Sequence, residues 1–241
     1  MYSYDYLIYN REERDLCAHL FRLLLDDQKE WKPLKKFLGK DEVENPRIFC
    51  EVSIILHGYV ARNGEIHDYM HGLCELIAEM NEIKDYTKFA EIPLEFHKAS
   101  KNIYSKRKID KAIEECTGDE LQNILNYNQE PNTSIYKTLQ SMFNAKPDLA
   151  VCEGNNLYVF EAKYDSSFEP KQLKLTNQIA QVWSKLLYRD LGFEEVPNVF
   201  VLKLGRQKFK PDVSWEYVYE ISKEFLGEDD FSTMVLSKVI K

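Results

Sequence analysis

The chain has 241 residues, of which 44% are hydrophobic, 13% aromatic and 30% charged. A chain of this length can bury about 70% of its unfolded surface, so a stable core needs neither disulfides nor structural metals. The apolar fraction excludes a disordered protein, and no apolar run approaches the roughly 20 residues that cross a bilayer. The sequence begins without the basic and apolar regions of a signal peptide, so we expect a cytoplasmic protein with no membrane segment.

The formal net charge of −8 at pH 7 argues against nucleic-acid binding through bulk charge, but it leaves room for a local basic site. Five cysteines, at positions 17, 50, 74, 116 and 152, are widely spaced and form no CxxC pair. This spacing indicates neither a zinc knuckle nor a redox dithiol. We expect the cysteines to be small, buried apolar residues in a reducing compartment.

The first 145 residues are mainly helical in pattern. Residues 10–25 place leucines at helical spacing after Asn10, a candidate N-cap, with two acids in the first turn. Apolar residues three and four apart also predict helices over 47–61 and 67–83. Residues 86–145 continue in this style, interrupted by two polar breaks.

The pattern changes at Lys146-Pro147. Residues 148–153 and 157–163 are short runs that favour β-strands, and Gly154-Asn155-Asn156 between them is typical of a tight turn. These features predict a β-hairpin, the clearest one in the sequence.

The rest of the chain alternates helix and strand. Helical spacing over 170–191 is followed by a β-rich apolar run over 198–204. Two closing helices are expected, the first capped by Ser214 and the second by Asp229.

The predicted hairpin brings charged residues together. Side chains alternate along a strand, and antiparallel pairing places Asp148 beside Glu161 and Lys163. The neighbours of Glu161 are apolar, so its charge needs a partner or a metal. Paired carboxylates with a main-chain carbonyl suit a hard cation such as Mg²⁺, and a lysine can orient water or offset charge in the transition state. The cluster therefore indicates hydrolysis of phosphodiester bonds.

Pro147-Asp148, twelve further residues and then Glu161-Ala162-Lys163 resemble the PD-(D/E)xK nuclease superfamily, which has the restriction-endonuclease-like fold. The resemblance covers about residues 10–25 and 146–204. It implies an α/β fold with a central mixed sheet flanked by helices, in the order helix, three-stranded meander, helix and strand. The chain would be a single nuclease-like domain over 1–241, with a mainly helical insertion at about 30–145 and its catalytic core at about 146–204.

One part of the family pattern has no clear counterpart. The first strand of the meander is not obvious, since residues 89–96 and 135–143 are both poor strand candidates. We interpret the long segment before the motif as the helical insertion.

The resemblance implies roles for the motif residues. Asp148 and Glu161 would bind Mg²⁺ or Mn²⁺ together with the main-chain carbonyl of Ala162, and Lys163 would act on the attacking water. Many members also carry a glutamate on the first helix. Glu13 is our candidate, and Glu12 is nearly as good.

The helix after the motif carries further candidates. Gln178 and Gln181 lie on a polar stripe opposite its apolar face. Some members of the superfamily place a glutamine from this helix near the scissile phosphate, and a solvated helix face is an equally good interpretation here.

The expected activity is metal-dependent cleavage of nucleic acid, with DNA favoured and 5′-phosphate ends, in restriction, repair or defence against mobile DNA. Two basic stretches, 98–111 and 203–210, are candidate phosphate contacts. A homodimer is an option where both strands are cut.

Two alternatives stay open. A nuclease-like protein that no longer cleaves could act as a binding or regulatory protein through a protein partner. His67 and His71 stand at i and i+4 as in HExxH zinc helices, but an aspartate replaces the required glutamate and no third ligand is evident. A zinc hydrolase is therefore a minor hypothesis.

Overall fold

The computed structural model describes residues 13–25, 30–51, 66–84, 135, 138, 142, 146–191 and 194–240. The chain divides into two compact units. The first combines Met1–Val52 with Lys146–Lys241, and the second is Ser53–Ala145.

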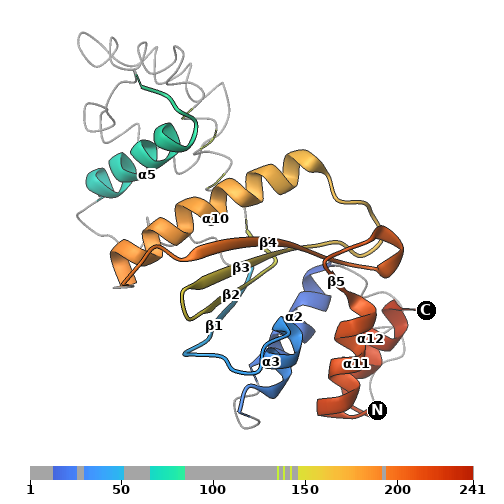
Figure 1. Ribbon diagram of the computed structural model, residues 1–241. Helices are drawn as coiled ribbons and strands as arrows, with labels where there is room; N and C mark the ends of the chain where they lie inside the picture. Colours follow the sequence, from blue (N-terminus) through green and yellow to red (C-terminus); the bar gives the residue numbers. More distant parts are fainter. Residues whose placement is uncertain are drawn as a thin grey trace. The chain divides into compact units, whose positions relative to one another are not determined.

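The first unit is built on a mixed five-stranded sheet (Figure 1). Its strands, in their order across the sheet, are β1 (Arg47–Cys50), β2 (Leu149–Glu153), β3 (Asn156–Ala162), β4 (Asn198–Gly205) and β5 (Val213–Ser214). The first three strands form an antiparallel meander, and β4 and β5 continue the sheet in parallel with β3. This arrangement confirms the α/β class and the mixed sheet predicted from the sequence.

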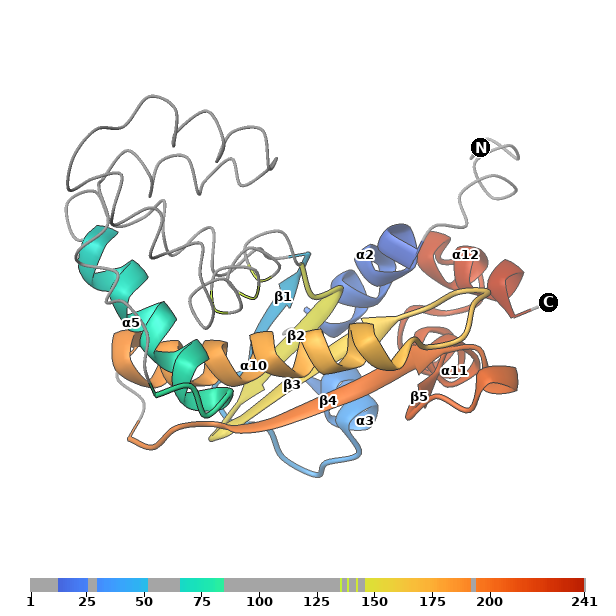
Figure 2. The same cartoon turned by 90° about the horizontal axis from the view of Figure 1, so that it is seen from above.

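Helices cover both faces of this sheet. One face carries α2 (Glu13–Leu24), α3 (Lys32–Leu38), α11 (Trp215–Leu226) and α12 (Phe231–Val239), and the other carries α10 (Pro170–Leu191) (Figures 1 and 2). The long α10 is the crossover that the parallel pair β3 and β4 requires. A short 3-10 helix, η3 (Gln207–Phe209), connects β4 to β5.

The core explains why the strands are almost continuously apolar. All five residues of β2 are buried, because the sheet is covered on both sides. Trp215 and the α2 leucines belong to the cluster on one face, while Trp183 of α10 packs edge-on against Phe49 of β1 on the other, with ring centroids 5.4 Å apart. Burying such a side chain contributes roughly 1.5–3 kcal/mol.

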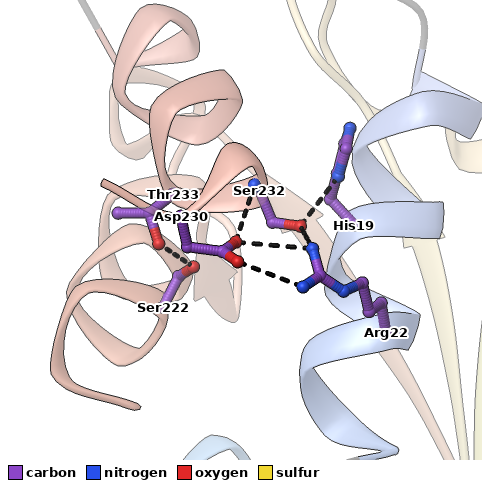
Figure 3. A network of polar contacts seen from close by, with 6 residues as sticks. All are labelled: His19, Arg22, Ser222, Asp230, Ser232 and Thr233. Carbon is purple, nitrogen blue, oxygen red and sulfur yellow. Dashed lines mark hydrogen bonds and ion pairs between the residues drawn. The ribbon is translucent and has the colours of Figure 1, made fainter. Parts of the chain in front are cut away.

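A polar network joins α2 to the two C-terminal helices (Figure 3). The Arg22 guanidinium donates to both carboxylate oxygens of Asp230, at 3.4 and 3.0 Å, and to Ser232 Oγ at 2.9 Å. Asp230 also caps α12 by accepting from the Ser232 amide at 2.8 Å, and His19 Nδ1 lies 3.0 Å from Ser232 Oγ. The network fixes α12, and with it the C-terminal layer, against the first helix.

Several predicted elements are confirmed. The hairpin forms β2 and β3 around Gly154, whose φ of 52° is the left-handed conformation expected at the turn. The helix over 170–191 and the strand at 198 are also present. Ser214 caps α11 by accepting from the Tyr217 amide, whereas the cap of α12 is Asp230 and not the predicted Asp229.

The helix predicted over 47–61 is wrong at its start, because Arg47–Cys50 form β1. This strand pairs antiparallel with β2 and is the first strand of the meander that the sequence did not reveal. A short apolar run fits either period, and pairing with a buried strand decides between them. Since α3 and β1 belong to the first unit, the second unit begins at Ser53 rather than near residue 30. Residues 52–61 lie outside the described part.

The second unit contains α5 (Ile66–Met80), in agreement with the helix predicted at 67–83. Its buried residues include Leu73, Cys74, Ile77 and Ala78. The rest of the predicted helical region from 86 to 134, with the basic stretch at 98–111, lies outside the described residues.

The predicted burial of the cysteines is confirmed at three of the four described positions and is wrong at Cys50. Cys17, Cys74 and Cys152 are buried free thiols, and Cys50 is partly exposed. Cys116 is not among the described residues. None of the described helices is both long and apolar enough to cross a membrane.

Candidate functional site

The hairpin brings Asp148, Glu161 and Lys163 to one end of the sheet. The register pairs Leu149 with Phe160, so the residue before β2 lies beside the end of β3. Asp148 Oδ2 accepts a 2.7 Å hydrogen bond from the amide of Ala162, and Lys163 Nζ donates to Glu161 Oε1 at 3.1 Å. Asp148 is thus held by the main chain between Glu161 and Lys163, and the three motif residues lie at the same end of the sheet, as their spacing predicted.

Glu161 is the most buried member of this group, with an exposed fraction of 6%. Besides Lys163, its carboxylate accepts hydrogen bonds from Gln172 Nε2 and from Thr176 Oγ1, the latter at 3.0 Å. Both donors lie on α10, one turn apart. Three donors therefore hold this carboxylate in one orientation, as a buried charge requires.

Gln172 and Thr176 were missed by sequence reasoning. A signal was available, because these residues extend the buried stripe of Ala180 and Trp183 toward the N-terminus of α10 in steps of three and four. Polar residues on an otherwise apolar stripe indicate a buried polar partner.

Gln178 and Gln181 are placed differently from what the resemblance implies. At 100° per residue, they lie about 200° and 140° around the helix from Thr176, so they do not share the face that holds Glu161. Both are partly exposed, and the Gln181 main chain accepts a bond from Ser184. The first two turns of α10 contribute side chains to the site, because the connection from β3 places them beside the end of that strand.

The first helix also reaches the site. Glu13 Oε1 accepts a 3.2 Å hydrogen bond from the amide of Tyr164, directly after Lys163. Glu13 therefore joins the acids around the hairpin end, as predicted. The alternative, Glu12, lies outside the described residues.

A further acid, Glu51, was missed because its segment was predicted as a helix. It follows β1, with a φ of 50°, and its amide donates to the Asp148 carbonyl at 3.2 Å. Its side chain pairs with Arg14, whose Nε lies 3.0 Å from Oε1. The main chain of Glu51 thus lies beside Asp148, while its carboxylate is paired with Arg14.

The electrostatics of the site reflect crowded acids. Burial raises the pKa of Asp148 to about 6; Glu161 and Glu13 add to this, against the opposing effects of the Ala162 amide and Lys163. Burial lowers the pKa of Lys163, but the hydrogen bond and charge of Glu161 outweigh it and leave that pKa above its ordinary value. The lysine is therefore charged at neutral pH. Asp148, in contrast, has a pKa of about 6, which is close to neutral pH.

Two cysteine thiols border Asp148. Burial raises the pKa of Cys17 well above its ordinary value, and Asp148 raises it further. Burial also raises the pKa of Cys50 to about 11, helped by Glu51 and Asp148. Both thiols therefore stay protonated at neutral pH and are poor nucleophiles.

The donor chemistry of this site fits a hard divalent cation. Asp148 and Glu161 supply carboxylate oxygens, and Ala162, which directly follows Glu161, supplies a main-chain oxygen. In the described ranges no three side chains of His, Cys, Asp or Glu are grouped closely enough to hold a metal ion. Mg²⁺ retains several water ligands and needs only one or two carboxylates from the protein. Asp148, Glu161 and the Ala162 carbonyl therefore suit Mg²⁺ better than a site that encloses the ion in protein ligands would. The side chains of His67 and His71 lie outside the described residues.

In the comparisons with known proteins, no family model, no curated protein and no solved structure matches this chain. The function is therefore inferred from the residues of the site and their geometry.

Proposed function

We propose that this protein is a metal-dependent nuclease with a restriction-endonuclease-like core, hydrolysing phosphodiester bonds with DNA as the expected substrate. The observation that carries the proposal is the group formed by Asp148, Glu161 and Lys163. It is joined by the Asp148–Ala162 and Lys163–Glu161 hydrogen bonds at the end of a buried hairpin.

The order of elements supports the proposal. The first unit runs α2, then the meander β1–β3, then α10 and β4, with α3 as an added helix. This is the order of helix, three-stranded meander, helix and strand that the motif implied. The second unit is inserted between β1 and β2 and ends at Ala145, three residues before Asp148.

Asp148, Glu161 and the Ala162 carbonyl would hold Mg²⁺ or Mn²⁺. When bound, such an ion polarises a phosphoryl oxygen and lowers the pKa of a bound water. Lys163 is charged, so its ammonium offsets negative charge at the phosphate or orients the attacking water rather than removing a proton. Gln172 and Thr176 fix the orientation of the Glu161 carboxylate. Attack of water at phosphorus, with the 3′-oxygen as the leaving group, would give a 3′-hydroxyl and a 5′-phosphate end.

The test is cleavage of linear, supercoiled and single-stranded DNA and of RNA, with Mn²⁺, with Mg²⁺ and with EDTA. Asp148→Asn, Glu161→Gln and Lys163→Met should each lower the metal-dependent rate by about 10²-fold or more. Glu228→Gln is the matched control, because Glu228 is an exposed acid paired with Lys223 on α11.

An undiminished rate in any two of the three site variants would contradict the proposal. Folded protein that cleaves none of the substrates with either metal would favour the silent, partner-binding alternative. If duplex cleavage is observed, sedimentation would show whether a homodimer supplies the two sites that cutting both strands requires.

A further inference from the structure

The connection between β4 and β5 lies directly beside the candidate site. Parallel pairing sets Ala162 next to Leu204, and the Lys163 amide donates to the Leu204 carbonyl at 2.8 Å. A Cβ added to Gly205 would lie 3.3 Å from the Lys163 carbonyl and 3.0 Å from the Phe168 ring, so glycine permits this close approach. Arg206 follows immediately, and Lys203 earlier in β4 pairs with Glu161, so the basic stretch 203–210 lies about one strand spacing from the end of β3.

We call Lys203, Arg206, Lys208 and Lys210 the basic platform. Aromatic rings support three of its cations. Lys203 Nζ lies 5.9 Å from the Phe168 ring centroid, Arg206 Cζ 5.7 Å from that of Tyr164, and Lys208 Nζ 4.7 Å from that of Phe209. Such contacts restrict long side chains before any ligand binds, which lowers the entropy lost on binding.

An aspartate occupies the centre of the platform. Asp165 Oδ1 lies 2.5 Å from Lys208 Nζ and 3.7 Å from Arg206 Nη1. The carboxylate is 59% exposed and Lys208 is 51% exposed, so water screens their attraction and the pair is easily exchanged.

Arg206 has donor capacity that this aspartate does not use. Its Nη1 lies 3.7 Å from Asp165 Oδ1, which exceeds a hydrogen-bond distance. A guanidinium presents its donors in a planar fork that matches a phosphate. The surroundings of Asp165 thus have the composition of a phosphate-binding position already filled by a carboxylate.

We propose that the basic platform binds the backbone phosphates of nucleic acid and directs the strand toward Lys163, and that Asp165 holds the phosphate position in the free protein. The inference rests on the proposed nuclease function and names how the substrate is held. Successive phosphates of a strand can contact the cations at the end of β4 and in the connection that follows, and they displace a single exposed carboxylate.

The experiment measures binding without cleavage. Fluorescein-labelled DNA, as a short duplex and as a single strand, is titrated with the full chain in EDTA over a range of salt concentrations, and anisotropy gives the affinity. Lys208→Gln should weaken binding about fivefold and reduce the slope of log affinity against log salt by about one. Asp165→Asn should strengthen binding about threefold, because it removes the carboxylate that pairs with Lys208 and Arg206.

Two exposed residues of another ion pair provide matched controls. Lys223→Gln and Glu228→Gln remove the same charges from α11 and the turn after it. They should leave affinity and salt slope unchanged. The competition also predicts that Asp165→Asn strengthens binding less when Lys208→Gln is present, which a change in overall charge alone would not produce.

The inference is overturned if the control variants change affinity as much as the platform variants do, or if Asp165→Asn leaves binding unchanged. Its failure is distinguishable from failure of the proposed function. Cleavage with unaltered binding in the platform variants would retain the nuclease and reject the platform. Binding that follows the predictions, in a protein that never cleaves, would retain the platform and reject the nuclease.

Discussion

The amide of Ala162 donates a 2.7 Å hydrogen bond to Asp148 Oδ2, which ties the residue before β2 to the last residue of β3. The bond favours the charged carboxylate, yet burial and the nearby charges of Glu161 and Glu13 outweigh it, and the pKa of Asp148 rises to about 6. The hairpin end therefore holds an acid whose charge is unfavourable in the metal-free fold.

Asp148 should make the metal-free protein less stable as the pH rises. Its pKa is about 6 when folded, against an ordinary value of 3.8, so the folded state binds more protons between these values. The contribution of Asp148 to the free energy of unfolding is fully present below about pH 4 and is lost as the pH rises through 6. Relative to wild type, Asp148→Asn should gain on the order of 1–3 kcal/mol between pH 4 and pH 8.

Urea unfolding of both proteins across this pH range, in EDTA, measures the gain. Glu228→Gln is the control, because its hydrogen bond to Lys223 lowers the pKa of Glu228 instead of raising it. A stability difference between wild type and Asp148→Asn that does not vary with pH would contradict the prediction.

Divalent metal should stabilise the wild-type fold. Because the cation would bind the folded protein and relieve the crowded acids, Mn²⁺ at about 100 times its dissociation constant should add about 2.7 kcal/mol. Thermal unfolding with Mn²⁺ and with EDTA measures the shift. Glu161→Gln and Asp148→Asn should lose most of it, while Glu228→Gln keeps it. An equal shift in all four proteins would locate the metal elsewhere.

Thr176→Val should affect cleavage more than stability alone explains. The substitution leaves Glu161 without the 3.0 Å bond to the Thr176 hydroxyl and should cost about 1–3 kcal/mol. Thr233→Val is the matched control, since it removes a buried hydroxyl bond, 2.7 Å long, to Ser222 on α11. Both variants should lose similar stability, but only Thr176→Val should lower the cleavage rate at a temperature where both are folded. Equal rates would show that Thr176 does not position the carboxylate.

Asp230→Ala should destabilise the C-terminal layer by about 1–2 kcal/mol. It removes both the helix cap on the Ser232 amide and the forked contact with Arg22 (Figure 3). Asp230→Asn can keep the cap, so it should cost about half as much, and only the Arg22 part should weaken with salt. Urea midpoints at two salt concentrations check this, and equal losses in both variants would mean that the cap contributes little.

Local patterns were sufficient for the elements that carry the motif. Gly154 with its asparagines specified the turn, and strand alternation then placed Asp148 opposite Glu161, because these depend on neighbours within a few residues. The helical period of 170–191 and the cap at Ser214 are equally local. The fold class and the motif group could therefore be predicted from the sequence.

The rest depended on contacts between distant segments. Arg47–Cys50 are a strand only because β2, about a hundred residues later, offers its edge. Glu51 beside Asp148, and Gln172 and Thr176 on Glu161, follow from that pairing and from where α10 crosses the sheet. Nor did the net charge of −8 show that Arg206 and Lys208 form ion pairs with Asp165, which lies two residues after Lys163. The sequence by itself determined the motif group and its hairpin. The tertiary structure decided which distant side chains bond to Glu161, which acids raise the pKa of Asp148 and which cations lie nearby, because burial and charge act through space.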